Sequence, residues 1–162
     1  MKIVRRKLED QEIKSLIADT KSFPDLTYVS KSRWQSFASP YVLEINNSFA
    51  GVCAIYRLTN WVKIGPLVIL KKYQGKGYGK TLMKKVIDEN NDKKLYIGSS
   101  CPIVGRIVTG FGFKKVTLLS LPKEIKLFLI KQIFEYFSFN LITEAIRKRL
   151  ILKREKYNFF VN

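Results

Sequence analysis

The most informative stretch of the sequence reads Lys71-Lys72-Tyr73-Gln74-Gly75-Lys76-Gly77-Tyr78-Gly79-Lys80-Thr81-Leu82-Met83-Lys84-Lys85-Val86-Ile87. The run from Trp61 to Leu70 before it is rich in Val, Ile and Leu, so the pattern predicts a strand, a glycine-rich loop and an amphipathic helix. Glycines let backbone N–H groups come close to a ligand, and a helix N-terminus carries about half a positive charge. Six lysines and no acid lie between Lys71 and Lys85. The loop is therefore suited to binding phosphate oxygens.

The glycine spacing argues against two common nucleotide-binding loops. A Walker A loop has the form G-x-x-x-x-G-K-[ST], but Gln74 stands where its first glycine should be, one residue before Gly75. The dinucleotide fingerprint G-x-G-x-x-G also fails, because a pattern begun at Gly75 ends on Lys80 and one begun at Gly77 ends on Leu82.

The pattern Gln74-x-x-Gly77-x-Gly79 instead resembles the Gln/Arg-x-x-Gly-x-Gly/Ala signature of the GNAT N-acetyltransferase superfamily, whose loop holds the pyrophosphate of acetyl-CoA. In that family the loop follows the fourth strand and opens the third helix. The predicted strand at 93–98, the short helix at 102–110 and the sequence Gly112-Phe113 resemble the fifth strand, the fourth helix and the entry to the sixth strand. The resemblance covers residues 1 to about 119. It implies an α/β (α+β) fold with a mixed, mostly antiparallel central sheet flanked by helices.

The sequence before the loop is consistent with this order. A helix is predicted from Asp10, and a second short helix includes Trp34 and Phe37. Three neighbouring antiparallel strands are predicted at 41–45, 50–56 and 61–70, with a turn at Asn46-Asn47. Pro66 inside the third strand indicates a bulge or a position without a ladder partner.

The resemblance implies a set of acetyl-CoA contacts on the strand and the loop. Backbone groups of Leu67 and Ile69 are expected to contact the pantetheine arm, and the loop is expected to enclose the pyrophosphate, with Lys76 and Lys80 screening its charge. The full set is Leu67, Val68, Ile69, Gln74, Gly75, Lys76, Gly77, Tyr78, Gly79, Lys80 and Thr81.

The residues that carry acid–base chemistry in many members of the family are replaced here. Val108 stands where a tyrosine often protonates the departing thiolate, and Lys63 stands where some members carry a glutamate base. Cys101 falls where an asparagine often contacts pantetheine, and a small buried side chain is the favoured interpretation.

Two weak catalytic candidates are left, Glu44 and Ser100. Glu44 could act as a base if it faced the cleft, although a carboxylate on a strand more often faces water. Ser100, with Ser99, could donate to the thiolate or merely cap the next helix. The catalytic residues are therefore not identified by the sequence.

The composition bounds the remaining possibilities. The chain has 162 residues, 46% of them hydrophobic, as expected of a single globular domain over 1–162. Histidine is absent, and Cys53 and Cys101 have no metal-ligand spacing, so no metal is predicted. We find neither a signal peptide nor 18 consecutive apolar residues, so the protein is expected in the cytoplasm without a transmembrane segment.

The charge and the last third of the chain leave the partner open. Thirty Lys and Arg against thirteen Asp and Glu give a net charge of +17, which favours an anionic partner over an uncommitted basic surface. The pattern predicts basic helical stretches in 122–156 and strand character at 157–161, and because members of the family usually end with a seventh strand, the resemblance implies that 122–156 is an insertion before the last strand. This insertion could pack on the core, bind a membrane surface or bind an RNA backbone.

The leading interpretation is an acetyl-CoA-dependent N-acyltransferase that moves an acetyl group to a primary amine by direct attack. One alternative is a catalytically degenerate GNAT fold that binds CoA as an interaction module. Another is an RNA-directed enzyme that acts on aminoacyl-tRNA. The acceptor amine is not identified, and a homodimer is left open.

Overall fold

The fold is built on a single mixed sheet, which the computed structural model shows for residues 1–21, 23, 25, 29–136 and 156–162. The sheet has seven strands in the order β1-β2-β3-β4-β5-β7-β6. The strands are β1 Lys2–Arg5, β2 Tyr41–Ile45, β3 Ser48–Arg57, β4 Trp61–Ile69, β5 Lys94–Ser99, β6 Lys114–Val116 and β7 Asn158–Val161. The helices are α1 Asp10–Thr20, α2 Lys31–Ser36, η1 Lys71–Tyr73, α3 Tyr78–Asp88, α4 Pro102–Gly110 and α5 Lys123–Tyr136.

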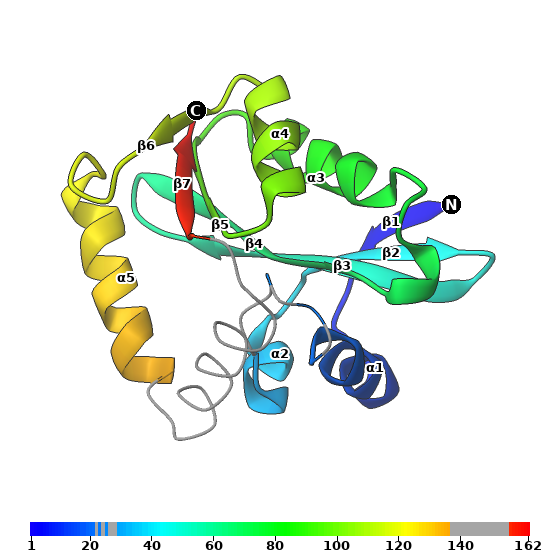
Figure 1. Ribbon diagram of the computed structural model, residues 1–162. Helices are drawn as coiled ribbons and strands as arrows, with labels where there is room; N and C mark the ends of the chain where they lie inside the picture. The colour runs from blue at the N-terminus through cyan, green and yellow to red at the C-terminus, as the bar shows by residue number, and fades with distance from the viewer. Residues whose placement is uncertain (22, 24, 26–28, 137–155) are drawn as a thin grey trace.

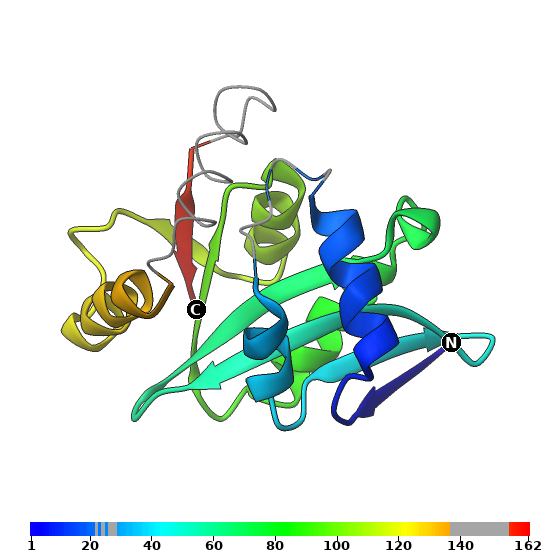
Figure 2. The ribbon, with the colours of Figure 1, turned by 90° about the horizontal axis from the view of Figure 1, so that it is seen from below.

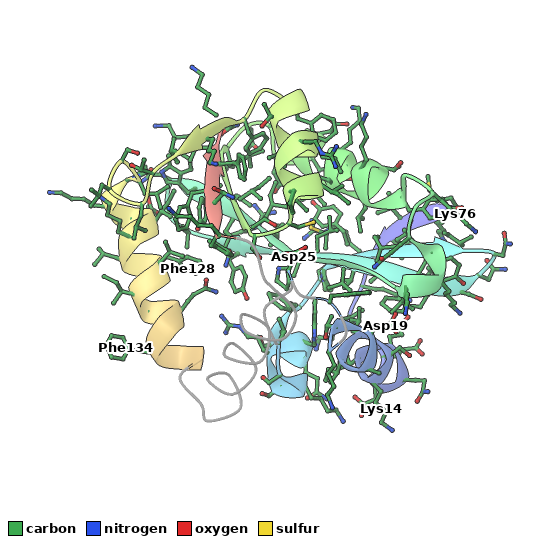
Figure 3. The ribbon with its side chains drawn as sticks, viewed as in Figure 1. Lys14, Asp19, Asp25, Lys76, Phe128 and Phe134 are labelled. Carbon is green, nitrogen blue, oxygen red and sulfur yellow. The ribbon has the colours of Figure 1, made fainter. Side chains whose placement is uncertain are left out.

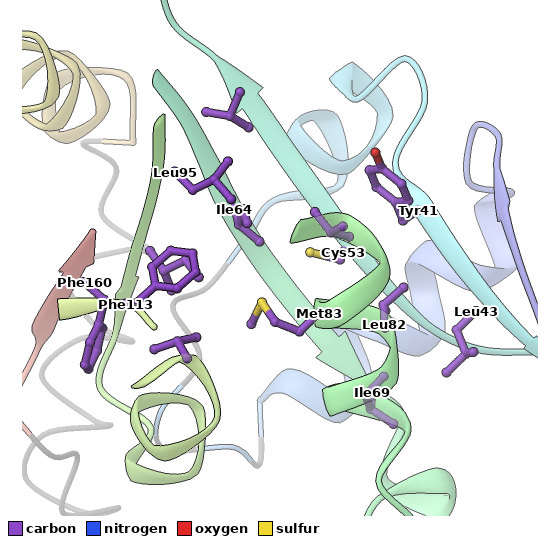
Figure 4. Close-up of a cluster of buried hydrophobic side chains, with 14 of the residues drawn as sticks. Tyr41, Leu43, Cys53, Ile64, Ile69, Leu82, Met83, Leu95, Phe113 and Phe160 are labelled. Atoms are coloured by element: carbon purple, nitrogen blue, oxygen red, sulfur yellow. The ribbon is translucent and has the colours of Figure 1, made fainter. Parts of the chain in front are cut away.

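The helices cover both faces of the sheet (Figure 1). Helices α3 and α4 lie on one face and α1 and α2 on the other, while α5 lies beside β6 and β7 (Figure 2). Under α3 and α4 the core includes Leu82, Met83, Ile64 and Phe113 (Figure 4). On the opposite face, Ile13 and Leu16 of α1 and Trp34 of α2 are buried against the sheet. The predicted amphipathic helices therefore exist, and their apolar stripes form the core.

Strands β2, β3 and β4 are antiparallel neighbours, as predicted, and β1, which was not predicted as a strand, pairs antiparallel with β2. Asn46 and Asn47 connect β2 to β3 with φ angles of 49° and 59°. Asparagine tolerates this left-handed region better than most residues, so the pair suits a tight hairpin turn.

A bulge interrupts β4, where Pro66 predicted one. Cys53 of β3 pairs with Leu67 and Ile55 pairs with Ile64, so β4 holds one extra residue between these pairs. The extra residue falls at Gly65-Pro66, where Gly65 has a φ of +117°. Proline has no N–H for the ladder, and glycine accepts this backbone conformation without strain.

Strands β4 and β5 pair only over their first four residues. They are parallel, from Trp61 opposite Lys94 to Ile64 opposite Ile97. Strand β4 then continues past the bulge to Ile69, whereas β5 ends at Ser99. From Gly65 onward, the β5-facing edge of β4 has no strand partner among the described residues. This edge leads directly into the glycine-rich loop.

The last strand closes the sheet. Strand β7 is antiparallel to both β5 and β6 and lies between them, which confirms the prediction that residues 157–161 pair in the central sheet. Helix α5 occupies the first of the two helical stretches predicted in 122–156. The second, Leu141–Lys156, lies outside the described residues except for Lys156.

Candidate functional site

The glycine-rich loop follows β4 and η1, and two hydrogen bonds fix the segment where it begins. The Gln74 side chain turns back, so that its Nε2 donates to the backbone oxygen of Ile69 at 2.8 Å. The backbone N–H of Lys71 donates to Asp19 Oδ2 at the end of α1, also at 2.8 Å. Gly75 and Gly77 take φ angles of +77° and +79°, which disfavour any side chain.

The loop delivers an open helix N-terminus. Gly77 is the N-cap of α3, and no side chain caps the helix. The first intrahelical bond is Thr81 N–H to the oxygen of Gly77, at 3.1 Å. The N–H groups of residues 78–80 precede it and have no acceptor within the helix. A Cβ built on Gly75 or Gly77 would meet no atom within 4 Å, so the space beside these two glycines, just before the helix start, is open.

Gly79 has a different role, because it faces the sheet. A Cβ there would lie 3.5 Å from Cγ1 of Ile69 and 3.9 Å from Cδ2 of Leu67. Glycine at this position lets the first turn of α3 pack closely on the end of β4.

The free edge of β4 also presents backbone groups. The N–H of Leu70 donates to the oxygen of Ala50 on β3 at 2.9 Å. The backbone N–H and C=O groups of successive residues in a strand point to alternate sides. The backbone groups of Leu67 and Ile69 therefore point away from β3, toward the unpaired edge. Val68 points the other way, with its side chain buried beside α1 and α2. Neither its side chain nor its backbone faces the loop, and the predicted contact of Val68 with a ligand stays a prediction.

Positive charge gathers at this loop. Lys71, Lys72, Lys76 and Lys80 are exposed and form no ion pair within the described part of the chain. Further along α3, Lys84 pairs with Asp88 at 2.7 Å and Lys85 with Glu89 at 2.8 Å. The uncompensated lysines thus lie at the end of the helix that already favours anions.

A pocket of about 330 Å³ adjoins this end of α3 and extends to α4. It is lined by Lys80, Ile103, Arg106, Ile107 and Gly110. Sequence reasoning missed Arg106, although it is the one charged residue of the α4 sequence, PIVGRIVTG. Lys80 and Arg106 make this pocket suitable for a second anionic group.

The structure gives no support to Glu44 as a base. Glu44 lies on β2, and β3 separates it from β4. Its Oε1 accepts from Arg6 Nε at 3.1 Å and from Arg6 Nη2 at 2.9 Å, and Arg6 also binds Glu12. Glu44 is therefore part of an ion-pair cluster near the β1 edge of the sheet.

The serines at the end of β5 and directly after it form hydrogen bonds with backbone groups. Ser100 is buried and its hydroxyl donates to the backbone oxygen of Asp25 at 3.0 Å. Ser99 Oγ accepts the N–H of Cys101, which is the N-cap of α4. Cys101 itself is half-buried rather than fully buried. Val108, the residue at the position of the family's tyrosine, is buried in the core under α4.

Lys63 lies in a partly buried cluster on the opposite face of the sheet. Its Nζ donates to Gln132 Oε1 at 2.7 Å and lies 5.0 Å and 5.3 Å from the ring centroids of Tyr56 and Phe128. Burial, and to a lesser extent the positive charge of Arg33, lowers the pKa of Lys63 from 10.5 to about 8. The sequence placed a lysine here but could not show this environment.

Tyr96 is opposite Lys63 in the β4–β5 register. Its hydroxyl is buried and has no hydrogen-bond partner within the described residues. Burial raises the pKa of this phenol above its ordinary value of 10.

The fold and the glycine-rich loop are typical of one class of protein. Comparison with known families identifies the family of this chain. The model of the acetyltransferase (GNAT) family matches residues 9–97, more than half of the chain. The chain belongs to the GNAT acetyltransferase family. A search of curated protein sequences found no match.

Solved structures show the same fold at low sequence identity. N-acetylglutamate synthase from Neisseria gonorrhoeae, complexed with coenzyme A and N-acetyl-glutamate, has a TM-score of 0.67 and 17% identity. The match covers 100% of this chain but 35% of that one. The ribosomal-protein-S18-alanine N-acetyltransferase from Escherichia coli has a TM-score of 0.60 and 14% identity over 99% and 92% of the two chains. A Bacillus subtilis acetyltransferase in complex with CoA has a TM-score of 0.58 and 19% identity over 72% and 78%.

Two searches of the described residues were negative. No helix there is long and apolar enough to cross a bilayer. Nor do these residues contain a group of three or more His, Cys, Asp or Glu side chains that could hold a metal ion.

Proposed function

We propose that the protein is an N-acetyltransferase that moves an acetyl group from acetyl-CoA to a primary amine. The observation that carries this proposal is the open N-terminus of α3 beside the unpaired edge of β4. A helix end without a side-chain cap binds anionic oxygens, and an unpaired strand edge binds an extended amide chain. Acetyl-CoA combines these two features, because its pyrophosphate is joined to a pantetheine arm.

Each part of the site has a corresponding part of acetyl-CoA. The N–H groups of residues 78–80 would bind the pyrophosphate, and Lys76 and Lys80 would screen its charge. Leu67 and Ile69 would bond the pantetheine amides, as the family resemblance implies. The pocket with Lys80 and Arg106 would take a further anionic group of the nucleotide. CoA-bound relatives in the family support this assignment.

The reaction needs little from the protein beyond positioning. The neutral amine of the acceptor attacks the thioester carbonyl carbon, the new C–N bond forms, and the C–S bond breaks to release CoA thiolate. The proton lost by the attacking nitrogen passes to the thiolate directly or through water, since Val108 cannot donate one. Holding the amine next to the thioester supplies most of the rate in such a transfer. A backbone N–H at the β4 bulge would stabilise the developing oxyanion.

The proposal is tested by the release of free thiol from acetyl-CoA in the presence of an amine panel. The panel contains amino acids, polyamines, peptides with a free N-terminus and aminoacyl-tRNA. We expect amine-dependent thiol release, with a mass increase of one acetyl group on the acceptor. Activity should rise with pH as the acceptor amine deprotonates.

A CoA-binding module without turnover is the second candidate, and the buried Val108 at the tyrosine position favours it. CoA binding without thiol release across the whole panel would support this candidate and overturn the first.

CoA itself should stabilise the protein against heat. A ligand that binds only the folded state adds about 2.7 kcal/mol at a concentration of about one hundred times Kd. The melting temperature should rise with CoA, and the rise at a fixed CoA concentration should be smaller in Lys80→Ala and Arg106→Ala. Differential scanning fluorimetry measures this. An unchanged melting temperature at saturating CoA would show that the loop does not bind it.

A further inference from the structure

Helix α5 has apolar side chains on two opposite sides, and the core uses one of them. On the inner side, Ile125 is fully buried, and the ring of Phe128 lies 5.4 Å from that of Tyr56 on β3. Figure 3 shows Phe128 on the side of α5 that faces the sheet and Phe134 on the side that faces away. Packing against the sheet therefore does not account for the apolar side chains on the outer side of α5.

Five large apolar side chains are exposed on this outer face. Leu127, Ile130 and Phe134 follow one another at helical spacing and are 67%, 51% and 77% exposed. In the connection before the helix, Leu118 and Leu119 are 52% and 85% exposed. Lys126 Nζ donates to the backbone oxygen of Leu119 at 2.5 Å, which ties that connection to the helix. We call these five residues the outer face. Large apolar side chains gathered on an exposed part of a folded protein are typical of an interaction site.

Lysines share this side of the helix. At 100° per residue, Lys123 and Lys126 fall on the side of the row formed by Leu127, Ile130 and Phe134. The acid of the first turn, Glu124, is directed elsewhere, because its carboxylate accepts the backbone N–H of Asn60 at 3.0 Å and the side-chain N–H of Asn60 at 3.1 Å. The outer face is thus apolar in its centre and cationic around it, in a chain whose net charge is +17.

This combination selects one kind of partner. A second copy of the chain would bring the same lysines opposite these, and because like charges repel, it is a poor match. Binding to RNA depends on phosphate contacts, which leave exposed leucine and isoleucine without a role. An anionic bilayer surface accepts both components, since apolar side chains enter the acyl boundary while lysines reach the headgroup phosphates.

We propose that the outer face of α5 docks on an anionic membrane surface, with the helix lying in the plane of the interface. The proposal is independent of the acetyltransferase activity, because the outer face includes none of the residues assigned to acetyl-CoA. It explains why α5 keeps large apolar residues on a side that the sheet does not cover.

Co-sedimentation with vesicles tests the proposal. The full chain is mixed with vesicles of phosphatidylcholine alone or of equal parts phosphatidylcholine and phosphatidylglycerol. We expect binding to the anionic vesicles, weaker binding at high salt, and little binding to the neutral ones. Leu127→Ser with Phe134→Ser should lower the partition coefficient about tenfold or more, since both remove apolar surface that would enter the interface. Ile103→Ser, a matched change of an exposed residue on α4, should keep it.

The same variants give the outcomes that would overturn the proposal. Equal binding of wild type and the double variant to anionic vesicles would show that the outer face is not the contact. A dimer in sedimentation velocity that the double variant disrupts would assign this face to a second copy. RNA retention lost in the double variant would assign it to nucleic acid. Because both substitutions are at exposed positions, we expect the fold to stay intact. Unchanged circular dichroism and an unchanged melting temperature will show this.

Discussion

Replacement of Gly77 by valine should abolish CoA binding while the protein still folds. Gly77 has a φ of +79° and open space where a Cβ would be. A valine there would resist this backbone conformation and fill the space in front of the first N–H groups of α3. We expect the affinity for CoA, measured by isothermal titration calorimetry, to fall about 100-fold or more, because several charge-assisted hydrogen bonds are lost together.

Gly112→Val is the matched control for this experiment. Gly112 has a φ of +88° and also has no atom within 4 Å of a built Cβ, but it lies after α4 and outside the loop. Both variants should lose a similar free energy of unfolding, about 1–2 kcal/mol. Only the Gly77 variant should lose CoA. Undiminished affinity in that variant would place the phosphates elsewhere.

Lys63→Met should change how stability depends on pH. The pKa of Lys63 falls from 10.5 in the unfolded chain to about 8 in the folded protein, so the unfolded state binds more protons between these values. The free energy of unfolding of the wild type should therefore receive an increasing contribution from Lys63 as pH rises from 8 to 10.5. Below pH 8 the group is charged in both states, and its full destabilising effect is present.

The difference between the variant and the wild type reports this effect. The free energy of unfolding of Lys63→Met minus that of the wild type should be highest below pH 8. This difference should fall by about 1–3 kcal/mol by pH 10.5. Urea unfolding across this pH range measures the difference, and Lys84→Met controls for removal of an exposed lysine. Parallel stability curves for Lys63→Met and wild type would contradict the assigned burial of the ammonium.

The elements of this fold could be predicted because their signals are local. The Asn46-Asn47 turn, the bulge at Pro66 and the amphipathic stripe of α1 each depend on neighbouring residues and on backbone preferences. The glycine-rich loop was equally readable, because left-handed backbone angles and an uncapped helix start are encoded by the glycines themselves.

The features of the site that could not be predicted depend on contacts between segments that are far apart in the chain. Arg106 joins the site because α4 packs beside α3, and no spacing rule connects Arg106 with Lys80. The pKa of Lys63 is lowered by burial and, to a lesser extent, by Arg33, and two residues of the cluster around it, Phe128 and Gln132, come from α5 far along the chain. The direction of the backbone and side chain of Val68 depends on its pairing with Val52 of β3.

The position of β7 affects how the protein is made. Strand β7 lies between β5 and β6 in space but follows both in the chain. While a ribosome extends the chain from its N-terminus, β5 is complete long before residues 158–161 exist, and one edge of it stays without a partner. Such an edge can pair with the same edge of another nascent chain. From the completion of β5 until β7 is made, the nascent chain is therefore exposed to such pairing, and a chaperone that covered this edge would protect it.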